Sequence, residues 1–270
     1  MEFNKENFDL LLEENEYLKN LLKKNNISFE KPKEILNLNL NDGEKINIFK
    51  SYFVGRNDIF AFQYINKDGK KSYMPACKAR PNLTGYCPNK CHDCQNKQYI
   101  GITDDEYKRH LSGKDIFGIY PLLQGDYCQL LAVDFDDSDF KESAISFKNV
   151  CAQYGIDALV EISGSGSGAH VWIFFEKIIK ASKARRLGTY LIFEAMNLSN
   201  GINFESLDRM FPSQDFVPFK GYGNLIALPL NGKKAVEGNT LFVDNNFIPY
   251  KLKDQINVLA STKKITEEEV

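Results

Sequence analysis

The stretches YCQLLAVDFDD at residues 127–137 and ALVEISGSGSGAHVWIFF at residues 158–175 determine most of what this sequence predicts. Both contain apolar runs of strand length, and the second is interrupted by a loop of alternating glycine and serine. Residues 139–154 have helical spacing with Gly155 as a stop, and a second helix is expected over 181–198. Strands that alternate with helices predict a mixed α/β (α+β) architecture.

Two acidic residues, Asp134 and Asp136, lie near the end of the first stretch. The two-residue period of a strand puts both carboxylates on one face, where they repel each other unless a cation lies between them. Hard divalent cations prefer carboxylate oxygens, so the pair predicts a magnesium or manganese site. The alternative is a polar strand end that leads into a helix cap at Asp137 or Ser138.

The glycine- and serine-rich loop, Gly164 to Ala169, lies between two apolar strands. Its backbone N–H groups and small hydroxyls are suited to hold phosphate oxygens, and His170 at its end is placed to donate to a triphosphate. The loop is not a Walker A motif, because GK[ST] is missing. A flexible linker is the other interpretation, but buried strands on both sides argue against it.

Four cysteines with the spacing C-x9-C-x3-C-x2-C lie in a polar loop over residues 75–98; they are Cys77, Cys87, Cys91 and Cys94. This spacing favours one structural zinc ion over free thiols, with His92 as a substitute ligand. Residues 67–97 carry seven basic and two acidic side chains. The loop is therefore expected to present basic residues to a phosphate backbone, and the candidates are Lys78, Arg80, Lys90 and Lys97. The alternative is a loop that zinc only stabilises, with its charges in solvent and no contact to a partner. Cys128 and Cys151 fall in apolar patterns and are expected in the core.

Other elements are predicted on the N-terminal side. Residues 48–56 (IFKSYFVGR) and 59–65 (IFAFQYI) are rich in aromatic and β-branched residues, which predicts a hairpin, and residues 104–111 predict a short helix. Residues 5–26 show the a/d spacing of a short coiled coil, with the seam Phe8, Leu11, Asn15, Leu18 and Leu22. This pattern indicates a dimer or a docking helix, and the alternative is an amphipathic helix packed on its own domain.

Composition sets limits on location and organisation. The chain has 270 residues, 43% of them hydrophobic, and a formal net charge of −2, so nucleic-acid binding would have to rest on local patches. The absence of an apolar run of membrane-spanning length and of an apolar signal segment predicts a cytoplasmic protein. The expected organisation is a helix over 1–27, a linker over 28–45, a catalytic domain over 46–250 and a C-terminal tail over 251–270.

Several strings occur in the order typical of one family. They are VGRNDIFAFQY, YMPAC, CxxxCxxC, GIYPLL, LAVDFDD, SGSGSGAHVWIFF, LDRMFPSQD and GYGNLIALPL, and the resemblance that they carry covers about residues 46–250. The sequence resembles the primase-polymerase domains of TOTE conflict systems and the related CRISPR-associated primase-polymerases, which are branches of the archaeo-eukaryotic primase superfamily. The resemblance implies an RRM-like catalytic sheet packed beside an N-terminal α/β unit.

The resemblance also implies roles for individual residues. Asp134 and Asp136 would hold two catalytic divalent ions, with Asp208 as the third acid and Asp215 as its competitor. Family members commonly carry Arg and Asn where this sequence has Gly164 and Ser167. The implied nucleotide-binding set is Ser163, Ser165, Ser167, Gly168, His170, Arg209, Lys220 and Asn224.

The function implied is template-directed nucleotide transfer to a 3′-hydroxyl by a two-metal mechanism, with or without initiation of primers. The implied partners are nucleoside triphosphates, a primer, a single-stranded DNA or RNA template, and a helicase, reverse transcriptase or CRISPR integrase. Two other classes use some of the same residues. A catalytically silent zinc-containing nucleic-acid-binding module would not need the acidic pair, and a two-metal nuclease would have little use for the glycine loop.

Overall fold

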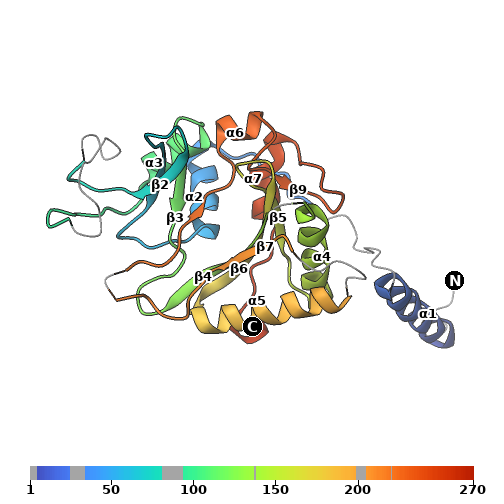
Figure 1. Cartoon of the computed structure of the whole chain (residues 1–270). Coiled ribbons are helices and arrows are strands. Elements are labelled where there is room, and N and C mark those ends of the chain that lie inside the picture. The colour runs from blue at the N-terminus through green and yellow to red at the C-terminus, as the bar shows by residue number, and fades with distance from the viewer. Residues whose placement is uncertain (1–4, 25–33, 81–93, 137, 199–204, 220) are drawn as a thin grey trace.

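The computed structural model describes residues 5–24, 34–80, 94–136, 138–198, 205–219 and 221–270 (Figure 1). Among these residues, no helix combines the length and the apolar character that a membrane crossing requires. The described elements form two antiparallel sheets with helices around them. This arrangement confirms the predicted mixed α/β fold.

The larger sheet has the strand order β7-β4-β6-β5-β9. Its strands are β4 (Tyr127–Asp136), β5 (Leu159–Ile162), β6 (Gly168–Lys180), β7 (Leu207–Phe211) and β9 (Phe242–Val243). Helices α4 (Phe140–Gln153) and α5 (Ala181–Leu198) connect them in the chain order β4-α4-β5-β6-α5-β7 and cover one face (Figure 1). This topology is the RRM-like βαββαβ arrangement that the resemblance implies.

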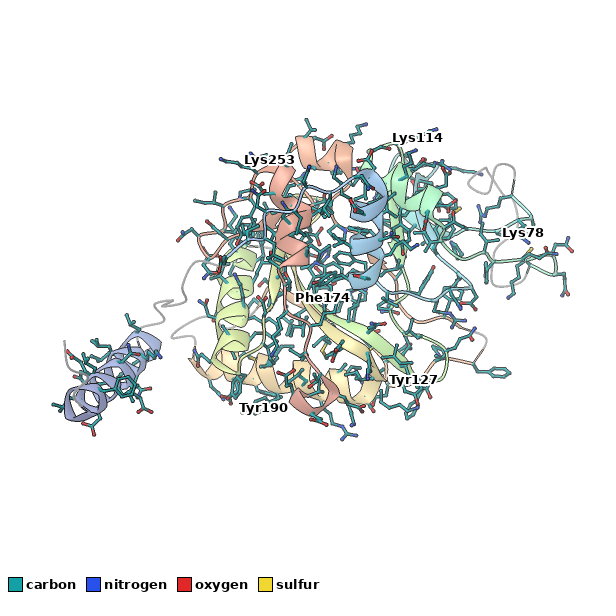
Figure 2. The ribbon with its side chains drawn as sticks, turned by 180° about the vertical axis from the view of Figure 1, so that it is seen from behind. Lys78, Lys114, Tyr127, Phe174, Tyr190 and Lys253 are labelled. Atoms are coloured by element: carbon teal, nitrogen blue, oxygen red, sulfur yellow. The ribbon has the colours of Figure 1, made fainter. Side chains whose placement is uncertain are left out.

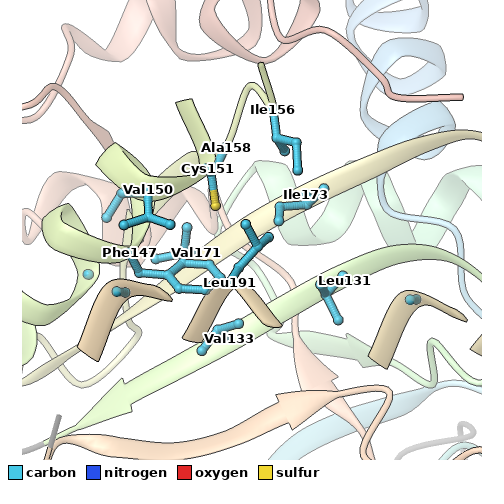
Figure 3. Close-up of a cluster of buried hydrophobic side chains, with 14 of the residues drawn as sticks. Leu131, Val133, Phe147, Val150, Cys151, Ile156, Ala158, Val171, Ile173 and Leu191 are labelled. Carbon is cyan, nitrogen blue, oxygen red and sulfur yellow. The ribbon is translucent and has the colours of Figure 1, made fainter. Parts of the chain in front are cut away.

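The face under α4 and α5 carries the first apolar core. Every second side chain of β4 and β6 points into it, including Leu131, Val133, Val171 and Ile173, where they meet Phe147 from α4 (Figure 3). The alternate side chains of the same strands point to the opposite face of the sheet. Strand parity therefore assigns each residue near the ends of β4 and β6 to one face or the other.

The smaller sheet has the order β2-β1-β3-β8. Its strands are β1 (Ala61–Ile65), β2 (Lys71–Pro75), β3 (Phe117–Ile119) and β8 (Ile226–Ala227), and its helices are α2 (Asp42–Tyr52) and α3 (Asp104–Leu111). The helix predicted over 104–111 is confirmed, and α3 begins with a capping box between Thr103 and Glu106.

The expectation of a strand over residues 48–56 is wrong, because most of this stretch lies in α2. Asn41 and Glu44 form a capping box that starts the helix. The buried residues Ile46 and Phe49 of the helix and the C-cap residue Phe53 follow at spacings of three and four, which places them along one side of the helix. The strand propensity of the aromatic residues is overridden by this periodicity, and the hairpin forms instead from β1 and β2.

A second apolar core joins the two sheets. The Phe53 ring lies 5.0 Å from that of Trp172 and 5.5 Å from that of Phe174, both on β6, and Tyr52 lies 4.9 Å from Phe174. Figure 2 shows Phe174 in the interior of the molecule. Because residues of both sheets fill this core, the RRM-like sheet and the N-terminal unit form one packed body.

Residues 251–270, expected as a tail, pack against α2 and the larger sheet. They contain η1 (Leu252–Asp254), α7 (Gln255–Ala260) and η2 (Glu267–Glu269), and α6 (Gly232–Val236) precedes them. Ile265 forms a parallel bridge with Phe175 of β6, and the Tyr52 hydroxyl donates to the Thr262 carbonyl at 2.8 Å. The segment thereby links the end of α2 to the larger sheet.

Helix α1 (Lys5–Lys24) lies apart from the two sheets in Figure 1. Phe8, Leu11 and Leu18 are 44%, 62% and 49% exposed. The seam is therefore not covered by the described part of the chain, which argues against the interpretation of an amphipathic helix packed on its own domain.

The buried side chain of His110 is expected to make the stability of the folded protein depend on pH. It is fully buried, where Nδ1 accepts from the Phe117 amide at 3.1 Å and Nε2 donates to the Pro229 carbonyl at 2.9 Å. Burial lowers the pKa of His110 to about 4, against the opposing effect of the backbone hydrogen bonds. Below pH 6.5 the unfolded chain binds a proton that the folded chain excludes, so stability falls as the pH falls.

The test compares urea unfolding of the wild type with His110→Gln, which cannot titrate. We expect the stability advantage of the wild type to be about 2 kcal/mol smaller at pH 5 than at pH 7.5. Groups that titrate in both proteins cancel in this difference. An advantage that stays constant over this range would contradict the prediction.

Candidate active site

The acidic pair lies at the end of β4, on the face opposite α4 and α5. Phe135 points into the first core, and strand parity places Asp134 and Asp136 on the other face. Across the sheet, Asp134 pairs with His170 and Asp136 pairs with Gly168. The predicted strand geometry is therefore present, and the end of the glycine loop lies directly beside the acids.

Asp208 joins this pair through an irregularity of β7. The register between β4 and β7 shifts where Asp134 pairs with Arg209 and Phe135 pairs with Leu207, which leaves Asp208 as the extra residue of a bulge. One oxygen from each of Asp134, Asp136 and Asp208 lies within 4.8 Å of the others. Asp215 is not in this group, and its carboxylate pairs with Arg185 of α5.

Burial and the nearby carboxylates affect the ionisation of Asp134. The pKa of Asp134 is raised to about 6, first by burial and then by the charges of Asp136 and Asp208, while His170 and Arg209 act in the opposite direction. Arg209 forms an ion pair with Asp208, with 2.5 Å between Nε and Oδ2. A divalent cation would relieve the remaining repulsion, and three carboxylates on one face are a donor set that fits magnesium or manganese.

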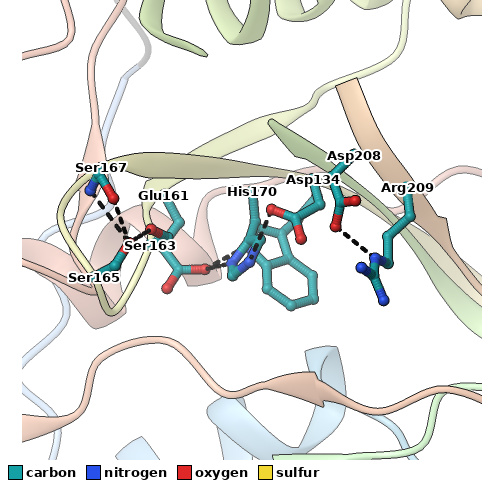
Figure 4. A network of polar contacts seen from close by, with 9 residues as sticks. Asp134, Glu161, Ser163, Ser165, Ser167, His170, Asp208 and Arg209 are labelled. Atoms are coloured by element: carbon teal, nitrogen blue, oxygen red, sulfur yellow. Dashed lines mark hydrogen bonds and ion pairs between the residues drawn. The ribbon is translucent and has the colours of Figure 1, made fainter. Parts of the chain in front are cut away.

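His170 is held by the carboxylates of Asp134 and Glu161, and Glu161 is not among the predicted site residues. Its Nε2 lies 3.5 Å from Asp134 Oδ1, and its Nδ1 lies 3.0 Å from Glu161 Oε2 (Figure 4). Burial opposes protonation of His170, but the charge and hydrogen bond of Glu161, followed by the charges of Asp134 and Asp136, raise its pKa to about 9. The ring is thus suited to carry positive charge toward an anionic ligand.

The sequence does contain a signal that could have identified Glu161 as a site residue. It is the only charged residue in the apolar run ALVEIS, and a buried acid in a strand usually has a specific partner. The partner was not apparent because it follows from the pairing of Glu161 with His170 across β5 and β6, which requires the sheet register.

The glycine and serine loop forms a tight turn beside the acids. A chain of hydroxyl contacts joins Ser163 to Ser165 at 2.9 Å and Ser165 to Ser167 at 3.0 Å. A Cβ atom on Gly168 would lie 2.1 Å from Asp136 Oδ1 and 2.8 Å from the Phe135 carbonyl oxygen. Only glycine at this position lets the Asp136 carboxylate and the loop lie this close together.

The other implied nucleotide-binding residues are placed differently. Arg209 lies at the acidic group, as described above, whereas Asn224 lies two residues before β8 of the smaller sheet. Lys220 lies outside the described residues.

The cysteine loop is described only at its two ends. Cys87, Cys91, Lys90 and His92 lie outside the described residues, whereas Cys77 and Cys94 are described and have free thiols. A bridge between Cys77 and Tyr99 brings the two ends of the loop together. The Lys78 and Lys97 side chains are exposed, and Lys78 is labelled on this projecting part of the chain in Figure 2.

Arg80 corrects one expectation about this basic segment. It is only 5% exposed, with its guanidinium 5.9 Å from the Phe62 ring and in contact with Met74. It packs on the smaller sheet instead of being presented to a phosphate backbone, because its long stem and flat head group cover apolar surface there.

Comparison with known proteins adds two findings. A family model described as the archaeo-eukaryotic primase domain of TOTE conflict systems matches residues 44–270. Among solved structures, the chain is similar to the polymerase domain of Ligase D from Mycobacterium tuberculosis in complex with DNA, with a TM-score of 0.41 and 11% identity over 84% of this chain and 86% of that chain. No curated protein matches this sequence.

Proposed function

The chain belongs to the archaeo-eukaryotic primase domain family of TOTE conflict systems, and from this membership we propose that it is a template-directed DNA primase-polymerase. It would add nucleotides to a 3′-hydroxyl and release pyrophosphate. The observation that supports this proposal most is the convergence of Asp134, Asp136 and Asp208 beside His170 and the glycine loop.

Each residue has a role in the proposed reaction. Asp134, Asp136 and Asp208 would hold two magnesium or manganese ions, which when bound supply charge for the attacking hydroxyl and for the leaving pyrophosphate. His170 would donate from Nε2 to the triphosphate, and the hydroxyls of Ser163, Ser165 and Ser167 would contribute further donors. These donors flank the acids, so a triphosphate bound by them would place its reacting phosphorus near the carboxylates.

Primer extension tests this proposal directly. A labelled primer on a single-stranded template, incubated with nucleotides and manganese or magnesium, should lengthen with release of pyrophosphate. DNA and RNA templates, and deoxyribonucleotides and ribonucleotides, are compared in the same assay. A helicase, a reverse transcriptase or a CRISPR integrase is proposed as a partner from the family resemblance, and genomic neighbourhood would identify it.

We propose that the cysteine loop holds one structural zinc ion through Cys77, Cys87, Cys91 and Cys94. Metal analysis of freshly purified protein should give about one zinc per chain. Cys94→Ser should lower the zinc content, whereas Cys128→Ala should not, because the Cys128 thiol lies in the apolar core. Protein without zinc at this stage would refute the site.

We also propose that α1 pairs with α1 of a second copy as a parallel coiled coil. The seam residues Phe8, Leu11 and Leu18 are exposed, and an Asn at a core position such as Asn15 favours a parallel dimer. Glu14 and Lys19 fall at the g and following e positions, where opposite charges face each other between parallel helices.

Sedimentation tests the pairing. The full chain should associate with increasing concentration, whereas Leu18→Glu and a chain of residues 28–270 should remain monomeric. Two and a half heptads give a weak interaction, so the measurement must extend to high protein concentration. A monomeric full chain throughout would leave docking to another protein as the role of α1.

A further inference from the structure

Glu161 is buried at the centre of the candidate site but does not belong to the acidic group. Its side chain is 1% exposed on β5, between the apolar residues Val160 and Ile162. One carboxylate oxygen, Oε2, accepts from the Trp172 indole Nε1 at 2.9 Å and lies 3.0 Å from His170 Nδ1. Figure 4 shows Glu161 on the side of the His170 ring away from Asp134.

This arrangement lowers the stability of the folded protein. A buried carboxylate loses its hydration, and an ion pair inside a protein contributes less to stability than apolar side chains of similar volume often do. On the face where Glu161 lies, its neighbours Leu159 and Trp172 belong to the second apolar core, so an apolar residue at this position would suit that core. A role at the site explains why an acid occupies it.

The geometry fixes the His170 ring. Because Nδ1 is tied to Glu161, the opposite nitrogen, Nε2, points toward Asp134 Oδ1 at 3.5 Å. Trp172 lies two residues after His170 on β6, and its indole N–H donates to the Glu161 carboxylate and holds it in place. A ring turned over about its bond to Cβ would lose the Glu161 contact and present a carbon where Nε2 now lies.

We propose that Glu161 is a positioning residue that orients the Nε2 of His170 toward the triphosphate of the incoming nucleotide and thereby sets nucleotide affinity. The inference rests on the proposed function, since it assumes that the site binds a nucleoside triphosphate. Glu161 makes no contact with the acids itself among its described interactions. Its effect on the reaction would therefore pass through His170.

Nucleotide binding tests the role of Glu161. The affinity of the full chain for a fluorescent nucleoside triphosphate is measured with manganese by anisotropy, and primer extension gives KM and kcat. Glu161→Leu should weaken binding roughly tenfold or more and raise KM by a similar factor, with a smaller change in kcat. Glu161→Gln, which still offers an oxygen to Nδ1, should recover most of the affinity. Equal losses in the two variants would overturn the orienting role.

A double-mutant cycle tests whether the effect passes through His170. In a His170→Ala background, Glu161→Leu should have little further effect on affinity. An undiminished effect there, or unchanged affinity in Glu161→Leu alone, would overturn the proposal. A wild-type chain that binds no nucleoside triphosphate would instead refute the proposed function, so the two failures are distinguishable.

A measurement on the wild type keeps the proposal testable if Glu161→Leu does not fold. Nitrogen NMR of the His170 ring, assigned through its contact with the Trp172 indole, should show a protonated Nδ1 that exchanges slowly with solvent. The ring centroids of these residues lie 5.6 Å apart, which permits this assignment. An unprotonated Nδ1 would contradict the donation to Glu161 and overturn the proposal.

Discussion

Primer extension by this chain is expected to fall roughly 10³-fold or more when Asp134 and Asp136 are both replaced by Ala. Loss of the proposed metal ions would remove several kcal/mol of transition-state stabilisation, and about 4 kcal/mol corresponds to a factor of 10³. The variant should remain folded, because the substitutions remove carboxylates that burial and mutual repulsion disfavour. Extension rates and thermal unfolding of both proteins check the two parts of this prediction.

The outcome separates the three classes of function. Extension by the wild type alone establishes a metal-dependent polymerase. Template binding without extension by either protein would favour a silent binding module. Degradation of labelled DNA by the wild type, with nucleotides left unused, would favour a two-metal nuclease. Asp215→Ala is a suitable control, because its carboxylate pairs with Arg185 and not with the acidic group.

The second large effect is expected at Asp208. Asp208→Asn should lower extension by about 10²-fold or more, because it removes one of three carboxylates around the proposed metal ions. It should also reduce the increase in melting temperature that manganese produces in the wild type. Asp215→Asn breaks a partly exposed ion pair and should change extension less than about threefold and stability by less than about 1 kcal/mol.

These two isosteric variants are compared at several manganese concentrations. Weaker binding in Asp208→Asn should appear as a higher manganese requirement before it appears as complete loss of activity. If Asp215→Asn showed the metal-dependent defect and Asp208→Asn did not, the third ligand would have to be reassigned, and the bulge in β7 would have no catalytic role.

Strand parity made part of the site predictable from the sequence. Asp134 and Asp136 share a face because they are two residues apart in an apolar strand, and His170 follows the loop that returns beside them. Asp208 was reached through the family resemblance instead. A regular strand would turn Asp208 and Arg209 to opposite faces, and the bulge that changes this is formed by pairing with a distant part of the chain.

The expectations for residues 48–56 and for Arg80 also failed because of long-range packing. Residues 48–56 have strand propensity, but their buried positions follow the helical period against a surface formed by β6. Arg80 has a charge that suggests solvent, yet it covers Phe62. In both cases the deciding partner lies on another element, so local sequence patterns could not identify it.

The apolar core shared by the two sheets limits how a substrate can enter. A movement that separated the two sheets would part Phe53 from Trp172 and Phe174 and expose rings that are now fully buried. At roughly 1.5–3 kcal/mol for each large apolar side chain, such a motion would cost a substantial share of the whole stability of a typical domain. The larger sheet, which carries the acids, is therefore expected to stay fixed against the smaller sheet. Any movement that admits a substrate would have to come from the loops beside the site.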